Sequence, residues 1–109
     1  MRRSIPTSAW PPGRTCVAIE FTDLRRARRW WLVVGGGSVD TCDQDPGHEV
    51  AATVRSTLRV LTHVWRGDVS WHDAMRAGDL VIDAPGHVRR VVPQWFGRSM
   101  LANALAARG

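Results

Sequence analysis

In the second half of the chain the spacing of apolar residues changes from that of a strand to that of a helix, which strongly limits the folds open to it. Val50, Ala52 and Val54 alternate with their neighbours, the period-two pattern of a strand with one dry face. From Leu58 to Trp65 apolar residues recur at helical spacing instead. The pattern predicts a mixed fold in which strands and helices each bury one apolar face.

Residues that favour helix ends divide this half into further elements. Ser56 or Thr57 can cap the first helix, and Gly67 can end it. Ser70, followed three residues later by Asp73, resembles a capping box with the shorter acid. We therefore predict a strand over 50–55, helices over 58–66 and 70–77, a strand over 80–84, and a further helix that begins near Pro85.

The first half of the chain predicts a three-stranded meander. We expect strands over 15–21, 30–34 and 38–42, with three glycines at 35–37 in the turn between the last two. The strand over 30–34 is apolar on both faces, which indicates a place inside the sheet with both sides covered.

Short motifs in a fixed order resemble one known family. They are the paired tryptophans at 30–31, DTCDQDPG at 40–47, VWRGD at 64–68, AMRAG at 74–78, and Pro93 with Trp95. Over residues 15–97 the chain resembles the sterol-carrier-protein-2-like (SCP2-like) domain, in the version found C-terminal to winged-helix transcriptional regulators of the HxlR type. One departure is Asp83-Ala84-Pro85, where the family more often has an acidic residue and a glycine before the proline.

The resemblance implies a single α+β domain with a five-stranded, mostly antiparallel sheet and helices covering one face. In carrier members a lipid chain lies between sheet and helices, and a C-terminal helix closes the site. We expect residues 1–14 to form a flexible N-terminal segment and residues 15–109 to form the domain. About fourteen residues precede Thr15, where a regulator would carry its winged helix, so we expect a stand-alone copy or a fragment.

Composition agrees with one small domain and leaves the choice of partner open. The 109 residues can bury one core, and the net charge of +5 comes from fifteen arginines without a lysine. That charge permits anionic partners without requiring them. The densest run, Arg25, Arg26, Arg28 and Arg29, is interpreted as a solvated loop, with a phosphate or anionic-lipid patch as the alternative. We do not expect nucleic-acid binding by the domain itself.

No apolar window is long enough for a membrane span or a signal peptide, so a cytoplasmic protein is expected.

No set of catalytic or metal-binding residues is apparent in the sequence. Cys16 and Cys42 are too few and too far apart for a zinc site, and in the resembled fold they stand two strands apart, beyond disulfide reach. Counting from Asp43, the glutamate of a calcium loop would fall on Val54. The four histidines occur singly on different elements, and no nucleotide-binding or nucleophile motif occurs. We predict no enzyme and no cofactor.

Six tryptophans and two phenylalanines dominate the apolar side of the chain. Bulky aromatic residues on facing elements can line a cavity for a flat or chain-like ligand, although the same residues also serve as a packed core. The predicted function is binding or sensing of a small hydrophobic ligand, lipid or sterol-like; the alternative is a protein-interaction or dimerisation domain of a transcriptional regulator, with a packed core and a homodimer or regulator partner. The candidate ligand-binding residues are Phe21, Trp31, Val33, Val54, Leu61, Trp65, Met75, Leu80, Ile82, Val92, Trp95 and Phe96.

The tail after Gly97 repeats apolar residues at helical spacing and is predicted to be a lid, a dimer contact or a frayed end.

Overall fold

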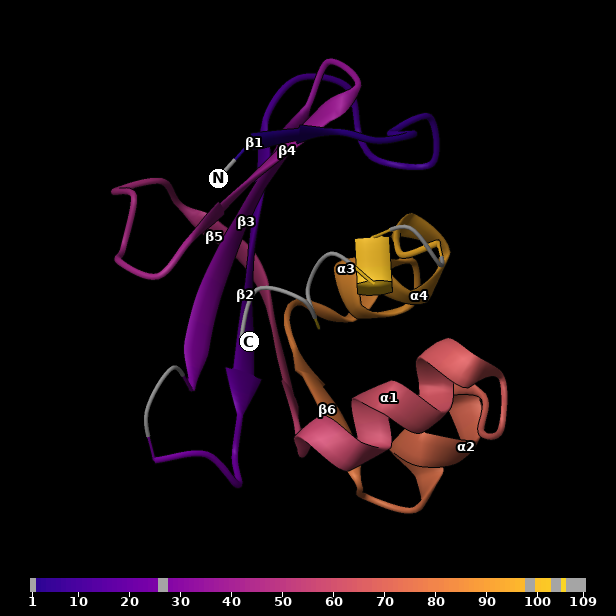
Figure 1. The fold of residues 1–109 in the computed structure, drawn as a ribbon. Coiled ribbons are helices and arrows are strands. Elements are labelled where there is room, and N and C mark those ends of the chain that lie inside the picture. Colours follow the sequence, from indigo (N-terminus) through magenta and orange to yellow (C-terminus); the bar gives the residue numbers. More distant parts are fainter. Residues whose placement is uncertain (1, 26–27, 98–99, 103–104, 106–109) are drawn as a thin grey trace.

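The computed structural model describes residues 2–25, 28–97, 100–102 and 105, and the strands within them form one mixed sheet (Figure 1). The strands are β1 (Arg2–Ser4), β2 (Thr15–Phe21), β3 (Arg29–Gly35), β4 (Ser38–Cys42), β5 (Val50–Ser56) and β6 (Leu80–Asp83). Their order across the sheet is β1-β4-β3-β2-β5-β6. Only β2 and β5 pair in parallel among these neighbours, so the sheet is mostly antiparallel, as expected.

The strand count differs from the five expected, because the N-terminal residues add a sixth strand within the described part of the chain. β1 pairs with β4 from Arg2↔Asp40 to Ser4↔Ser38. The backbone N–H of Ile5 then donates to Gly37 O at 3.0 Å, and that of Gly37 donates to Thr7 Oγ1 at 2.9 Å. Within the segment that was expected to be flexible, Arg2–Ser4, Ile5 and Thr7 are thus hydrogen-bonded along the edge of β4 and its turn.

Helix α1 (Leu58–Arg66) has the ends that the sequence predicted. The Thr57 side chain accepts a hydrogen bond from Val60 N, and Gly67 ends the helix at φ 82°. A left-handed φ of this size suits glycine, which carries no Cβ to clash with the backbone.

Helix α2 (Trp71–Arg76) follows with Ser70 as its N-cap, accepting from the backbone of Asp73 at 3.0 Å. Two single-turn helices, α3 (Gly86–Arg89) and α4 (Val92–Trp95), come after β6. Pro85 stands at the N-cap position of α3. All four labelled helices lie on the same side of the sheet, as predicted for the first two (Figure 1).

The two faces of the sheet are built from alternate residues of the same strands. On the helix face, Val17 and Ile19 of β2 lie beside Leu32 of β3, and all three are buried. The face on the other side of the sheet, here called the open face, carries Ala18 beside Trp31. β3 does lie inside the sheet, but the labelled helices cover only one of its faces, contrary to the expectation that both would be covered (Figure 1).

The core fills the space between the helix face and the helices. It includes Leu61 of α1, Ala74 of α2 and Val92 of α4, together with Met100 and Leu101 of the tail, all buried. The described part of the tail therefore packs against the core and does not form a frayed end.

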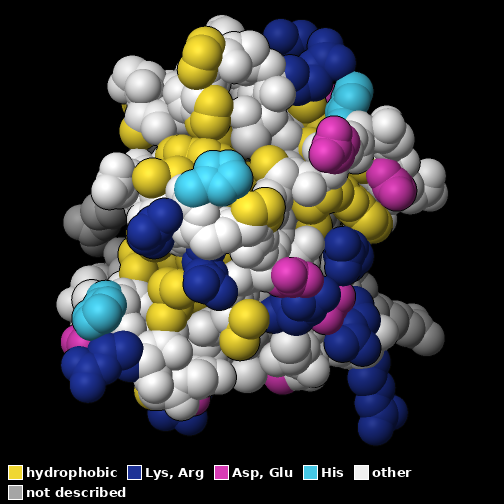
Figure 2. All heavy atoms as spheres, turned by 180° about the vertical axis from the view of Figure 1, so that it is seen from behind, with side chains coloured by type: hydrophobic (Ala, Val, Ile, Leu, Met, Phe, Trp, Pro, Cys, Tyr) yellow, Lys and Arg dark blue, Asp and Glu magenta, His cyan; other side chains and the backbone are white. Residues whose placement is uncertain are grey.

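Among the described helices, none has both the length and the apolar character needed to cross a membrane. Seen from behind, hydrophobic side chains form patches interrupted by arginine, acidic and histidine side chains (Figure 2). Among the described side chains on this face, the hydrophobic ones therefore do not form one broad apolar surface.

Candidate functional site

The candidate site is a groove of ≈ 520 Å³ where the N-terminal loop meets α3, α4 and the starts of β2 and β5. In Figure 1 the loop between β1 and β2 extends toward the α3 and α4 region of the molecule. The groove, called here the α4 groove, is lined by Pro11, Pro12, Arg14, Thr15, Cys16, His48, Glu49, Ala51, Val88 and Trp95. Its lining thus combines an apolar wall from prolines, Ala51, Val88 and Trp95 with polar residues from two separate segments, 14–16 and 48–49.

An aromatic cluster supports the wall of the α4 groove. The ring of Trp10 packs on Trp95 with centroids 5.3 Å apart and on Phe96 at 5.2 Å, and Phe96 in turn contacts Trp71 at 5.6 Å. Tilted pairs at these distances are favourable beyond the area they bury. They fix the position of Trp95, which is 9% exposed and is the aromatic residue of the groove lining.

Trp10 also carries a polar group without a partner. The residue is 6% exposed, and its Nε1–H has no hydrogen-bond partner among the described residues. A buried unsatisfied donor costs about 1 to 3 kcal/mol. Sequence reasoning missed Trp10 by placing it in a flexible segment; the signal was a large aromatic residue directly before Pro11 and Pro12, since so apolar a side chain is rarely left in solvent.

The polar residues of the groove lining include Arg14, His48 and Glu49. Arg14 and His48 also line a second concavity of ≈ 580 Å³, which Val33 and Cys42 of the open face help to form. The two hollows therefore share residues at the end of the sheet where β2 and β5 begin. This arrangement can hold a molecule with one apolar and one polar part.

Neither cysteine is prepared for nucleophilic chemistry. Burial raises the pKa of the Cys16 thiol, and the carboxylate of Asp45 and the thiol of Cys42 raise it further. Burial likewise raises the pKa of Cys42, with Asp40 next in importance. Both cysteines are free, and a raised pKa keeps a thiol in its neutral, weakly nucleophilic form at pH 7.

Other polar groups make structural contacts. His63 Nδ1 lies 3.1 Å from Asp68 Oδ2 at the end of α1. Within the described residues, no three His, Cys, Asp or Glu side chains gather as a metal ion would require.

The structure separates the twelve candidate residues into three groups. Phe21, Val54, Leu61, Leu80, Ile82, Val92, Trp95 and Phe96 are buried in the core on the helix side, and Trp65 and Met75 pack against that core while partly exposed. Trp31 and Val33 lie on the open face instead, because the register pairs them with Ala18 and Cys16. The sequence could not choose the face, since the strand is apolar on both sides. Trp31, Trp65 and Trp95 therefore do not form one cluster.

Comparison with known proteins gives no match to a protein-family model and none to a curated protein. Solved structures do show similar folds. The UbiJ-SCP2 ubiquinone synthesis protein aligns with a TM-score of 0.57 at 19% identity, over 84% of this chain and 70% of that chain. The fold is thus SCP2-like, as the sequence motifs indicated.

Two further similar structures are those of an alkylsulfatase. The stereoselective inverting sec-alkylsulfatase Pisa1 from Pseudomonas sp. aligns with a TM-score of 0.60 at 17% identity, and a double mutant of PisA1 with 0.61 at 16%. Each alignment covers 78% of this chain but only 14% of the sulfatase chain. The likeness therefore concerns one small part of that enzyme and the fold alone.

Proposed function

We propose that this domain binds a small hydrophobic or amphiphilic molecule, lipid or sterol-like, without transforming it, and that the α4 groove is where the molecule enters. The observation that carries the proposal is the groove wall of Pro11, Pro12, Val88 and Trp95 in a domain of SCP2-like fold. Its volume of ≈ 520 Å³ falls in the range of about 300 to 1,000 Å³ usual for small-molecule sites.

The names of the similar structures agree with this choice of ligand. One is a ubiquinone synthesis protein and the other acts on sec-alkyl sulfates, and both names refer to compounds with an apolar part. In this chain the apolar part would lie against Trp95 and Val88, while Arg14 and His48 face the polar part. The buried candidate residues of the core would line a deeper extension of the groove if the ligand separates α4 from the sheet.

The experiment combines native mass spectrometry of the purified protein with titration of decanoate and cholesterol sulfate. A co-purifying apolar compound, or binding that changes tryptophan fluorescence and raises the melting temperature, supports the proposal, because a ligand selective for the folded state stabilises it. The groove-filling variant Val88→Trp should weaken decanoate binding about tenfold or more, since the added ring occupies the wall of the groove.

The matched control is Val81→Trp, which adds the same ring at a valine that is 48% exposed on β6 and does not line the α4 groove. Equal affinities of the two variants, or no binding by the parent protein of either ligand, would reject the groove as the site.

A packed interaction domain is the second candidate, and the filled core favours it. Eleven large side chains of the described core, between Val17 and Met100 in the sequence, are fully buried, so the interior is closed in this state. The open face, with Trp31 and Val33 half-buried, would then be the contact with a second copy or a regulator partner. Sedimentation velocity at micromolar concentration tests this candidate.

A further inference from the structure

A notch at the edge of the sheet is separate from the α4 groove. β3 pairs with β4 only from Gly35↔Ser38 to Trp31↔Cys42, whereas its pairing with β2 continues to Glu20↔Arg29. The start of β3 therefore extends past the end of β4. The space left beside it has a volume of ≈ 380 Å³ and is lined by Arg28, Arg29, Trp30, Trp31 and Asp43; we call it the arginine notch.

The two tryptophans of the notch stand on opposite faces of the sheet. Trp30 pairs with Ile19, whose side chain is in the core, and Trp31 pairs with Ala18 of the open face. Both indoles are partly exposed, so the notch offers ring surface on two sides of one strand. The guanidinium of Arg29 lies over the Trp31 ring, 5.4 Å from its centroid, a cation–π arrangement that holds the ring in place.

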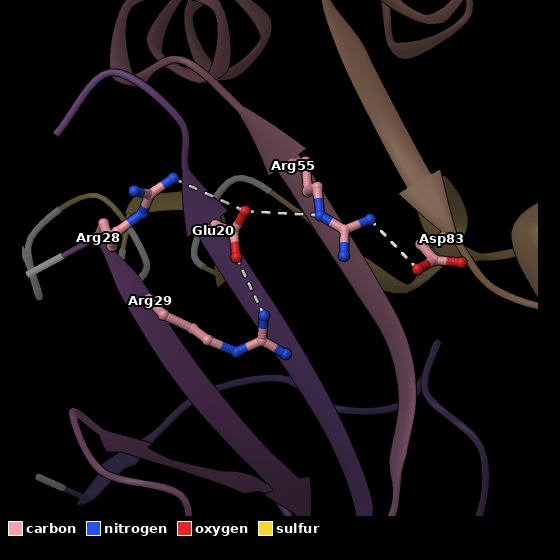
Figure 3. Close-up of polar contacts among 5 residues, drawn as sticks. All are labelled: Glu20, Arg28, Arg29, Arg55 and Asp83. Atoms are coloured by element: carbon pink, nitrogen blue, oxygen red, sulfur yellow. Dashed lines mark hydrogen bonds and ion pairs between the residues drawn. The ribbon is translucent and has the colours of Figure 1, made fainter.

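Of the three arginines in the ion-pair network beside the notch, Arg28 lies farthest from its carboxylate partner (Figure 3). Glu20 Oε2 is 3.0 Å from Arg29, and Glu20 Oε1 is 3.5 Å from Arg55 but 4.0 Å from Arg28. Arg55 also reaches Asp83 at 3.2 Å. Three arginines thus share two carboxylates in this network, and Arg28, with a side chain 52% exposed, has the longest ion pair.

We propose that the arginine notch binds a small planar anion, an aromatic ring that carries a phosphate or carboxylate group, as a site distinct from the α4 groove. The ring packs against the partly exposed indole of Trp31, on the same face of the sheet as Glu20, and the anionic group accepts hydrogen bonds from the guanidinium of Arg28. A volume of ≈ 380 Å³ suits one ring system with one charged group and is small for a chain of nucleotides. Each half of the ligand alone lacks one of the two contacts and binds more weakly.

Asp43 limits the orientation in which the ligand can bind in the arginine notch. Its carboxylate lines the same notch and repels an anion, so the charged group of the ligand lies toward Arg28 and away from Asp43. Neutralising Asp43 should consequently tighten binding, whereas neutralising Arg28 should weaken it. Opposite effects from two residues of one notch cannot arise from a general loss of folding.

The experiment measures binding of adenosine 5′-monophosphate, naphthalene-2-carboxylate, adenosine and inorganic phosphate by isothermal titration calorimetry on the full chain in low salt. The two ring anions should bind at least about tenfold more tightly than adenosine or phosphate, since charge-assisted hydrogen bonds and ring stacking both contribute. Arg28→Ser should weaken the ring anions about tenfold, and Asp43→Asn should tighten them about threefold. Raising the salt concentration to 0.5 M should weaken binding by the parent protein through screening.

The matched control is Arg25→Ser, which removes an exposed arginine that does not line the notch and should change affinity less than about twofold. An equal loss in Arg25→Ser and Arg28→Ser would mean attraction to general positive charge and would overturn the site. Equal binding of phosphate and adenosine 5′-monophosphate, or no binding of either ring anion, would overturn it as well. Decanoate binding should be unchanged in Arg28→Ser, which separates this result from the α4 groove.

Discussion

The two faces of the sheet use the same strands and reach stability by different means. On the helix face, Val17, Leu32 and Leu61 are fully buried among apolar neighbours from the helices. On the open face, Ala18 is equally inaccessible, but it lies beside Trp31 and next to Glu20, whose ion pairs run across the sheet. Burial on the helix face thus comes from a second layer, whereas burial on the open face comes from large side chains of the sheet itself.

This difference indicates where each kind of contact is available to a ligand. The helix face is closed by its own helices, and access to its apolar interior is expected only at its end, where Trp95 and Val88 border the α4 groove. The open face keeps partly exposed tryptophan surface and arginines, as at the arginine notch. The two proposed ligands would thus lie apart, the apolar one at the border of the helix face and the anionic one at the edge of the open face.

The largest expected effect is a difference in the free energy of unfolding between a variant of the helix side and a variant of the open face. Leu61→Ala should lower the free energy of unfolding by about 3 kcal/mol, because it leaves a cavity in the closed core. Val33→Ala, on the open face, should lower it by about 1 kcal/mol or less, because that side chain is only partly buried and its surroundings can adjust. Urea unfolding of both variants measures the difference, and equal losses would show that the open face is packed as tightly as the core.

A smaller effect is expected from the ion pairs of the open face. Glu20→Gln should lower the free energy of unfolding by about 1 kcal/mol at low salt, because the pairs with Arg29 and Arg55 are partly exposed to solvent. In 1 M sodium chloride the parent and the variant should approach each other through screening. A loss that persists unchanged in high salt would assign Glu20 a packing role instead.

The smallest effect near neutral pH concerns Cys16, whose thiol pKa is raised in the folded state, with burial as the main cause. The folded state then holds the thiol proton more tightly than the unfolded chain does, where the pKa is about 8.5. This contribution to stability is present below that pH and is lost as the pH rises through the folded-state pKa. We expect the parent protein to lose stability above about pH 8.5 more steeply than Cys16→Ala does. Thermal unfolding at each pH measures this, and parallel profiles would contradict the shift.

The sequence predicted local structure well where the signals were local. Thr57, Gly67 and Ser70 act at helix ends through hydrogen bonds and a left-handed φ that involve only neighbouring residues, so their roles could be deduced from spacing. The order of motifs also indicated the SCP2-like fold, which the similarity to UbiJ-SCP2 supports. The ligand-binding role of the candidate residues and the link to a regulator stay predictions.

The features that could not be predicted from the sequence depend on contacts between residues far apart in the chain. β1 forms because β4, more than thirty residues later, presents an unpaired edge, and Trp10 is buried because Trp95 and Phe96 meet it there.

The ends of α1, the start of α2 and the mixed α+β class were thus determined by the sequence itself, since period, caps and turn residues act within a few positions. Only the tertiary structure decided that Trp31 faces away from the helices and that Trp95 borders a groove. The physical reason is that alternation in a strand separates two faces without naming them, and the face that is buried is fixed only when strands pair and helices pack on one side.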